Sequence, residues 1–423
     1  MAWGAKRGIT DITLKLHAND AALVSLVLLS ARTFEKNEAC ELAQALAVNT
    51  SLVELFASGH DIGIEGAAAI GAALKTNSTL QVLCIGGSEM GDHGTAALIA
   101  EGLLHNRGLQ RLDLDYKSLT TAEHLSPLLR QHTTLRDLRL GRNQLGHYGI
   151  IGLCEGLQYS PSLTSLDLSA NGITAQAAAA LASALPASLQ HLDLSENAMS
   201  SDVGAVFFNS LAAVQSASLT SLTLRDCELD TVAGQSLAAA LASPGLAALT
   251  RLDLTNNTQA HTAAGCCSAN LQWLSLSNNQ LDAEAASALA QTISASNTLR
   301  FLDVSNNNIE PIGVDALLLL TCLHELRVFN NKLGNDGAAA VQTALLKCKE
   351  CCSLQTLDVG ANGINGTGIA VILSAVQQCS SITVLELGGN TIDDTAEAAI
   401  KYSQQNYPQL DVCFKADGQS MSS

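Results

Sequence analysis

Residues 163–173 read Leu163-Thr164-Ser165-Leu166-Asp167-Leu168-Ser169-Ala170-Asn171-Gly172-Ile173. Apolar and polar side chains alternate through the middle of this stretch, which is the period of a half-buried strand. The leucines then point to one side and the residues between them to the other. The asparagine follows the last strand leucine by three residues, where its amide can donate to and accept from backbone groups that the strand leaves unpaired. The stretch therefore predicts a short strand that ends in a turn held by a buried asparagine.

The pattern Leu-x-x-Leu-x-Leu recurs along almost the whole chain. Its first position falls at Leu23, Leu52, Leu80, Leu109, Leu135, Leu163, Leu189, Leu219, Leu249, Leu271, Leu299, Leu323, Leu354 and Ile382. Nine of these fourteen repeats carry the asparagine, and His60, Ser88, Lys117 and Cys227 replace it in four others. Repetition at such a period indicates a solenoid, in which each repeat packs only on its neighbours.

A helix is predicted after each strand and turn. Glycine recurs fourteen residues after the first leucine, at Gly66, Gly94, Gly149, Gly313, Gly337 and Gly368. Apolar residues follow at helical spacing, as in Ala67, Ile70 and Leu74. Strands stack about 4.8 Å apart, whereas helix axes need about 8–10 Å. This mismatch predicts an α/β horseshoe solenoid of about fourteen repeats, with parallel strands on the concave face and helices on the convex face.

With these features, the chain resembles the leucine-rich repeats of the ribonuclease inhibitor and of NLR immune receptors, and more distantly those of Ran GTPase-activating proteins. The shared pattern Leu-x-x-Leu-x-Leu-x-x-Asn-x-Leu covers residues from about 23 to 412. The resemblance implies a protein-binding scaffold or adaptor that uses its concave face and catalyses nothing. A GTPase activator of the Ran-activating type, an inhibitor of a basic enzyme and an NLR-like sensor fragment stay open as alternatives, because one repeat fold serves many binding tasks.

The ends and two short repeats depart from the pattern. Residues 1–22 are expected to be an N-terminal cap, with a capping strand over 9–14, residues 23–414 the solenoid, and residues 415–423 a polar, disordered tail. The ninth repeat, 249–270, and the eleventh, from Leu299, are short. We expect a loop or a single helical turn in place of their helices, or alternatively a local change of curvature that shapes a binding surface.

Charge and composition narrow the class of partner. The formal net charge of −17 disfavours nucleic acid, whose binding needs an excess of Lys and Arg, and an anionic membrane surface. A basic protein partner is compatible with it. The chain lacks a long apolar segment and a Gly-x4-Gly-Lys phosphate loop, and its twelve Cys are scattered. These features favour a cytoplasmic monomer without a cofactor, although a nuclear or ciliary location stays open.

An acidic row is predicted on the concave face, at the fifth position of the repeats. Its members are Asp113, Asp167, Asp193, Asp253, Asp303, Asp358 and Glu386, interrupted by residues that include Arg139 and Arg327. We take Asp167, Asp193, Asp253 and Asp303 as candidate binding residues for a basic partner. The alternative is that Leu-Asp-Leu is simply the commonest form of this repeat.

An aromatic cluster is the more informative candidate. Trp273 and Phe301 occupy the third position of consecutive repeats, and Phe329 lies at the seventh position one repeat further on. Together with Arg251 and Arg327, they are typical of an interface hot spot. The alternative is that the rings pack locally between strands.

Three further groups of residues are weaker candidates for a functional site. Arginines 107, 111, 130, 136, 139 and 142 form either a dock for an acidic segment or a solvated, partly self-neutralised face. Cys348, Cys351 and Cys352 lack the fourth ligand that zinc needs, so no metal site is expected. His191, Asp193 and Ser195 share one strand, but no nucleophile elbow or oxyanion loop accompanies them, so we expect no catalytic triad.

Overall fold

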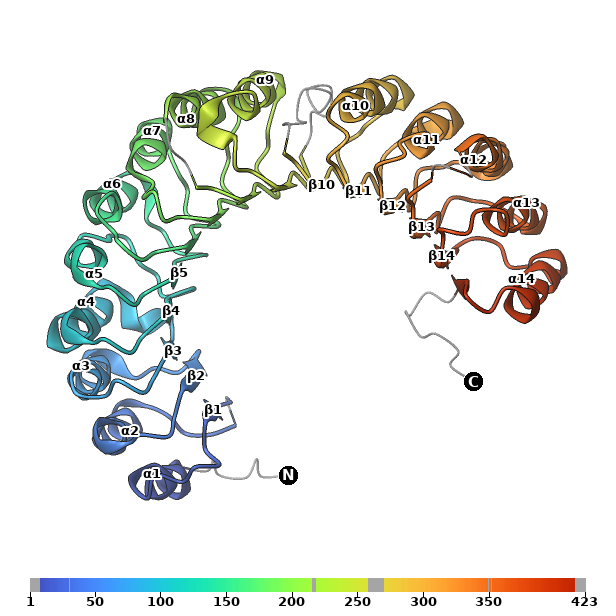
Figure 1. Ribbon diagram of the computed structural model, residues 1–423. Helices are drawn as coiled ribbons and strands as arrows, with labels where there is room; N and C mark the ends of the chain where they lie inside the picture. Colours follow the sequence, from blue (N-terminus) through green and yellow to red (C-terminus); the bar gives the residue numbers. More distant parts are fainter. Residues whose placement is uncertain are drawn as a thin grey trace. The chain divides into compact units, whose positions relative to one another are not determined.

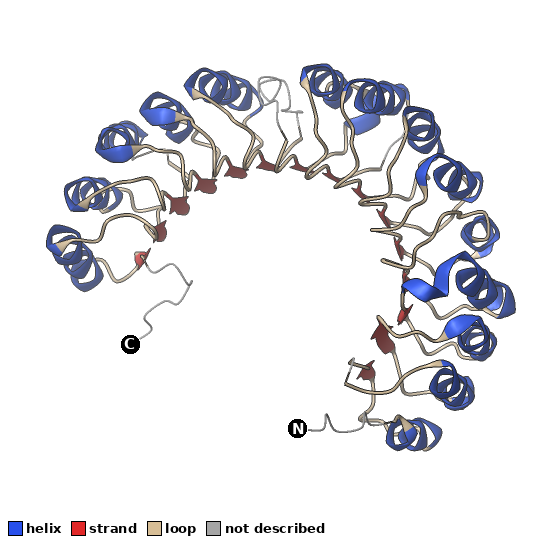
Figure 2. Cartoon of the chain, turned by 180° about the vertical axis from the view of Figure 1, so that it is seen from behind, coloured by secondary structure: helices blue, strands red, loops and turns tan. Residues whose placement is uncertain are grey.

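The computed structural model describes residues 8–29, 31–214, 218–257, 270–348, 350 and 352–414. The chain divides into two compact units, one of residues 1–198 with 214–219 and one of residues 199–213 with 220–423. In each unit the strands line the concave side and the helices form the convex side (Figure 1). The same two layers are seen from behind in Figure 2.

The first unit alternates helices and strands. Its elements are α1 Thr10–His17, β1 Ser25–Val27, α2 Lys36–Val48, β2 Glu54–Ser58, α3 Gly63–Leu74, β3 Val82–Gly86, α4 Gly91–Glu101, β4 Arg111–Asp113, α5 Leu125–Gln131, β5 Asp137–Arg139, α6 Gly146–Leu157, β6 Ser165–Asp167, α7 Ala175–Ala184 and β7 His191–Asp193. Short 3-10 helices, η1 Ser88–Met90 and η2 Leu103–His105, flank α4.

The second unit continues the same alternation. Its elements are α8 Ser201–Ala213, β8 Ser221–Thr223, α9 Thr231–Leu241, η3 Pro244–Leu246, β9 Arg251–Asp253, β10 Trp273–Ser275, α10 Ala283–Ser296, β11 Phe301–Asp303, α11 Glu310–Leu318, β12 Glu325–Arg327, α12 Gly334–Cys348, β13 Thr356–Asp358, α13 Gly366–Val376, β14 Val384–Glu386, α14 Asp394–Asn406 and β15 Asp411–Cys413.

Within each unit the strands pair in parallel and in chain order. Equivalent residues of the repeats face one another, so Leu166 of β6 lies opposite Leu138 and Leu192 on the neighbouring strands. These three side chains are at most 2% exposed. The repeat leucines thus form a continuous core behind the strands, and each unit is the α/β leucine-rich-repeat solenoid that the sequence predicts.

The predicted role of the asparagines is confirmed. The Asn307 side chain donates to the carbonyls of Leu276 and Val304, and its oxygen accepts from the backbone N–H groups of Asn279 and Leu281. Asn197 and Asn362 make equivalent bonds in their own repeats. Because one amide satisfies backbone groups of two consecutive repeats, it fixes the spacing between them.

Two expectations about repeat shape are wrong. Residues 9–14 do not form a capping strand, because Ile9, Ile12 and Leu16 recur at helical spacing and are all buried in and beside α1. The eleventh repeat keeps a real helix, α11, with Val314 and Leu317 buried. The eleventh repeat is short because its helix is short, with nine residues in α11. The buried face of α11 still covers the core behind β11. The outer segment of the ninth repeat, 258–269, and the tail, 415–423, lie outside the described residues.

Candidate protein-binding surface

The second unit brings the predicted aromatic pair together. Arg251, Trp273, Phe301 and Glu325 are paired residues on the four consecutive strands β9 to β12. They occupy the third position of their repeats, and their strand neighbour at the fourth position is a buried leucine in each case. Since side chains alternate along a strand, all four point to the concave side.

Arginine and aromatic side chains form one stack along this row. The rings of Trp273 and Phe301 are 4.7 Å apart between centroids and 6° from parallel. The guanidinium carbon of Arg251 lies 3.3 Å from the centroid of the Trp273 ring, and that of Arg327 lies 5.3 Å from the Phe301 centroid. Cations placed over ring faces are attracted by the negative face of the π-system. The stack formed by Arg251, Trp273, Phe301 and Arg327 is called the Arg–Trp–Phe–Arg stack below.

The stack combines the two alternatives considered for the cluster. The ring faces pack locally, against each other and against the arginines, while both rings stay half-buried rather than buried. Because the faces are covered, what remains accessible is ring edge, which carries the positive end of the aromatic quadrupole. Such a surface is rigid and needs little ordering when a partner binds.

The two arginines of the stack differ in their remaining contacts. The Arg327 guanidinium forms a 2.7 Å ion pair with Glu325. The Arg251 side chain is exposed, and within the described part of the chain its guanidinium forms neither a hydrogen bond nor an ion pair. Arg251 therefore holds its N–H donors in a fixed plane over Trp273 with their hydrogen-bonding capacity unused.

Phe329 is not part of this stack. It lies at the rim, 38% exposed, and packs over the backbone of Gly360 in the next repeat, where a Cβ atom would come within 2.7 Å of the ring. The sequence predicts that Phe329 shares a surface with Trp273 and Phe301, but it could not show that the Phe329 ring lies against Gly360, two residues after β13.

The acidic row has a structural role in the turns. In each of Asp167, Asp193, Asp253, Asp303 and Asp358, one carboxylate oxygen accepts the backbone N–H two residues further on. Asp253 and Asp358 are less than 9% exposed. Burial, aided by the charges of Glu386 and Asp303, raises the pKa of Asp358 to about 6. These bonds close the end of each strand and explain the recurrent Leu-Asp-Leu without a ligand.

Three of the six arginines in the first-unit cluster form ion pairs with acidic side chains. Asp137 lies between Arg111, at 2.6 Å, and Arg139, at 3.7 Å. Arg142 pairs with Glu196. The solvated, self-neutralised face is thus the better description. Cys351 lies outside the described residues, and among those described no three His, Cys, Asp or Glu side chains gather as a metal ion requires.

An asparagine groove in the second unit was not predicted from the sequence. Asn256, Asn278, Asn306 and Asn330 have left-handed backbones, and their side-chain amides bond in pairs, Asn278 to Asn256 and Asn330 to Asn306. The groove they line has a volume of about 570 Å³. The signal was present in the repeated Asn-Asn doublets, of which only the second residue was singled out.

Comparison with known proteins agrees with this architecture. A family model described as "Leucine Rich repeat" matches residues 159–182, 267–290, 295–318, 320–341, 350–373 and 378–396. The repeats of this chain are leucine-rich repeats, similar to those of the ribonuclease inhibitor and of NACHT, LRR and PYD domains-containing proteins. It is 29% identical to the mouse ribonuclease inhibitor over 66% of its own length and 64% of that protein. It is 30% identical to human NACHT, LRR and PYD domains-containing protein 12 over 59% of its own length and 24% of the relative.

The matched region therefore spans less than two thirds of either relative. Among solved structures, an internalin from Listeria monocytogenes is similar at 18% identity and a TM-score of 0.47, over 96% of this leucine-rich repeat chain and 94% of that one. None of the described helices combines the length and apolar character that a membrane crossing requires.

Proposed function

We propose that this leucine-rich repeat protein is a scaffold or adaptor that binds another protein on the concave side of its second unit, around the Arg–Trp–Phe–Arg stack. One observation carries the proposal. The Arg251 guanidinium is held 3.3 Å over Trp273, exposed and without a hydrogen-bond acceptor among the described residues. Aromatic and arginine side chains are the residue types that dominate binding energy at interfaces.

The chemistry of the surface favours a particular partner segment. Arg251 offers paired N–H donors that fit a carboxylate. The adjacent ring edges of Trp273 and Phe301 offer an apolar contact. A segment with an acidic residue next to an apolar or aromatic one complements both features. A basic segment along the acidic row stays a prediction, because one oxygen of each of five aspartates is already bonded to a turn.

The test is a pair of matched double variants. Trp273→Ala with Phe301→Ala removes both rings, whereas Thr356→Ala with Val384→Ala changes the same repeat position on β13 and β14. For a partner identified by cross-linking and then purified, we expect the first variant to weaken binding about 30-fold or more. The second should bind as the wild type does.

Equal affinity of both double variants for the partner would contradict the proposed binding surface. Circular dichroism melting of each variant distinguishes loss of the surface from loss of the fold. Arg251→Lys, which keeps the charge but loses the planar fork, should weaken binding of an acidic segment and leave the folding of β9 intact.

Inhibition of a ribonuclease is a second candidate, favoured by the similarity to the mouse ribonuclease inhibitor. The chain's formal net charge of −17 suits a basic enzyme. If this candidate is right, adding the protein to a pancreatic-type ribonuclease lowers RNA hydrolysis in a stoichiometric titration. Undiminished hydrolysis with the protein in tenfold excess rejects it. Activation of a Ran-type GTPase and a sensor role stay untested predictions.

A further inference from the structure

The asparagine groove runs along the turns that follow strands β8 to β12 of the second unit. The described side chains that line its volume of about 570 Å³ are all polar. They include one asparagine from each of four consecutive repeats and one cation from the first and the last repeat of the groove: Asn256, Asn278, Asn306, Asn330, Arg225 and Lys332. No residue of the Arg–Trp–Phe–Arg stack lines the groove, so it is a separate candidate site.

The four asparagines stand at the eighth position of their repeats, where the backbone is left-handed. Asparagine tolerates this conformation, but Ala170, Glu196 and Ala361 adopt it at the same position of other repeats. Among the fourteen repeats, only the ninth to the twelfth carry asparagine there. The next residue is the buried asparagine that joins consecutive repeats, and the row of these buried residues is called the asparagine ladder. Backbone conformation alone therefore does not explain the exposed row of amides.

The exposed amides use only part of their hydrogen-bonding capacity. Asn278 donates to Asn256, and Asn330 donates to Asn306. Among the described residues, the side-chain oxygens of Asn278 and Asn330 accept no hydrogen bond and the side-chain nitrogen of Asn306 donates none. An amide side chain carries the same kinds of donor and acceptor as a peptide group. The row therefore matches the backbone of an extended chain.

Charge selects the kind of chain. Arg225 and Lys332 line the groove, and no described carboxylate does. Arg225 lies 3.9 Å from Asp253, an ion pair that leaves the arginine side chain about half exposed. Asp226 lies beside the groove and accepts a hydrogen bond from the Asn256 amide. An acidic segment is thus attracted at either end of the groove, whereas a basic one is repelled.

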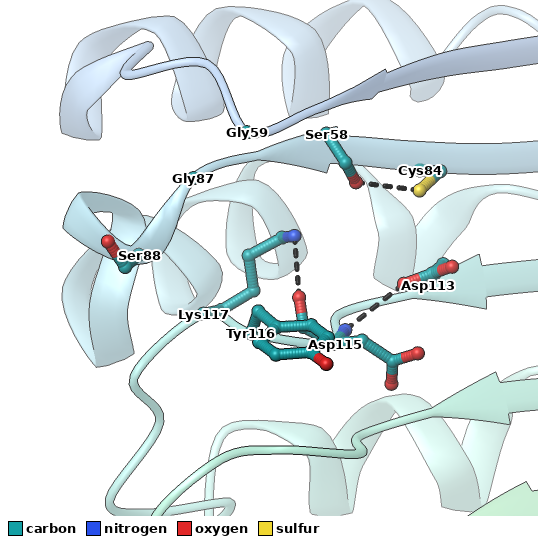
Figure 3. A pocket seen from close by; sticks show the side chains of 9 residues that line it. All are labelled: Ser58, Gly59, Cys84, Gly87, Ser88, Asp113, Asp115, Tyr116 and Lys117. Carbon is teal, nitrogen blue, oxygen red and sulfur yellow. Dashed lines mark hydrogen bonds between the residues drawn. The ribbon is translucent and has the colours of Figure 1, made fainter.

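A pocket of the first unit lacks this opening for an anion. There the Lys117 amine donates to the Asp115 carbonyl, and Asp113 and Asp115 line the same wall (Figure 3). Lys117 is also only 1% exposed. The two cations of the asparagine groove are exposed, so they are accessible to a ligand in a way that Lys117 is not.

The repeat spacing sets the length of the ligand. Arg225 and Lys332 belong to the repeats of β8 and β12, and the strands between them pair in order. Four strand spacings of about 4.8 Å give a span of about 19 Å. An extended peptide rises about 3.3 Å per residue, so about six residues cover this span.

We propose that the asparagine groove binds an extended acidic peptide segment of a partner protein, about six residues long. The peptide backbone bonds to the open amide groups of Asn278, Asn306 and Asn330. An acidic side chain near either end of the segment faces Arg225 or Lys332. This site goes beyond the proposed binding at the Arg–Trp–Phe–Arg stack and does not depend on it.

Fluorescence anisotropy with the full chain tests the proposal. The probe is a fluorescein-labelled peptide, Glu-Ala-Ser-Ala-Ser-Glu, and its controls carry Gln or Lys at both ends. We expect the acidic peptide to bind at least about fivefold more tightly than either control, because it alone pairs with both cations. Equal binding of the three peptides, or no binding of the acidic one at about 1 mM protein, overturns the proposal. Tighter binding of an oligothymidylate of the same length also overturns it.

A double variant removes the open amide groups. Asn278→Ala with Asn306→Ala should fold, because Ala170 and Ala361 already occupy the same repeat position with a left-handed backbone. We expect it to weaken binding of the acidic peptide about tenfold, since an acceptor and a donor are lost. Glu196→Ala changes the same repeat position outside the groove and should bind the peptide as the wild type does.

Two further variants assign the charge and separate the two sites. Lys332→Gln copies Gln280, which has a left-handed backbone at the same position of the tenth repeat, and should reduce the preference for the acidic over the Gln peptide. Trp273→Ala with Phe301→Ala reports on the stack and should still bind the peptide. If the asparagine double variant is folded by circular dichroism and binds the peptide undiminished, the groove proposal is wrong, whatever the stack variant does.

Discussion

At the residue scale, the same side-chain type can serve the fold or a ligand, and its hydrogen bonds decide which. The sequence predicts that the fifth-position aspartates form an acidic row on the concave face, yet five of them each accept a backbone N–H with one carboxylate oxygen. Arg251 shows the opposite case. Its position gives it an aromatic platform and leaves its donors unused by the described residues. The proposed binding surface of the second unit therefore rests on the arginines and rings more than on the acids.

Asp358 gives a pH prediction at this scale. Its pKa is raised from 3.8 to about 6, so the folded protein holds this proton more tightly than the unfolded chain does. Between pH 4 and 6 the unfolded state binds fewer protons at this group, so the contribution of Asp358 to the free energy of unfolding falls as pH rises, by up to about 3 kcal/mol, and is constant above about pH 7.

Asp358→Asn tests this, because the amide oxygen still accepts the Gly360 N–H while the titration is removed. The unfolding free energy of the variant minus that of the wild type, from urea titrations at pH 4 to 7.5, should increase with pH. A difference that stays constant over this range contradicts the assignment.

At the element scale, close helix packing depends on glycine. A Cβ atom on Gly71 of α3 would lie 2.5 Å from the backbone oxygen of Leu98 in α4. The obstacle is backbone rather than a flexible side-chain end, so α4 would have to shift as a whole. Small residues on the convex side are thus a steric requirement of helix spacing and not merely a consequence of helix propensity.

Gly71→Ala should therefore destabilise the protein by about 1–3 kcal/mol, despite the better helix propensity of alanine. Ala72→Ser, which adds one heavy atom at an exposed position of the same helix, should change stability by less than about 0.5 kcal/mol. Thermal melts of both variants measure the contrast. Equal melting temperatures would show that α4 moves away at no cost.

At the scale of the whole molecule, each unit is a row of neighbours without a closed globular core. A residue in such a row meets the equivalent residues of the two adjacent repeats, so features build up as rows across strands. The Arg–Trp–Phe–Arg stack, the acidic row and the asparagine ladder are all of this kind. Lys117 stands out because it replaces a repeat asparagine and lines a pocket, rather than extending a row.

The repeat period alone determined the strands, the row of buried asparagines that follows them, and the concave position of Trp273 and Phe301. These follow from local alternation and from identical register in every repeat, which carry over from one repeat to the next. The tertiary structure decided those features that the strand register does not fix. It turned the rings face to face, directed Phe329 over Gly360, made the cap a helix, and buried Lys117 beside Cys84 and Asp115. Side-chain torsions and burial set these outcomes, and both depend on neighbours about 25 to 30 residues away, which no local pattern encodes.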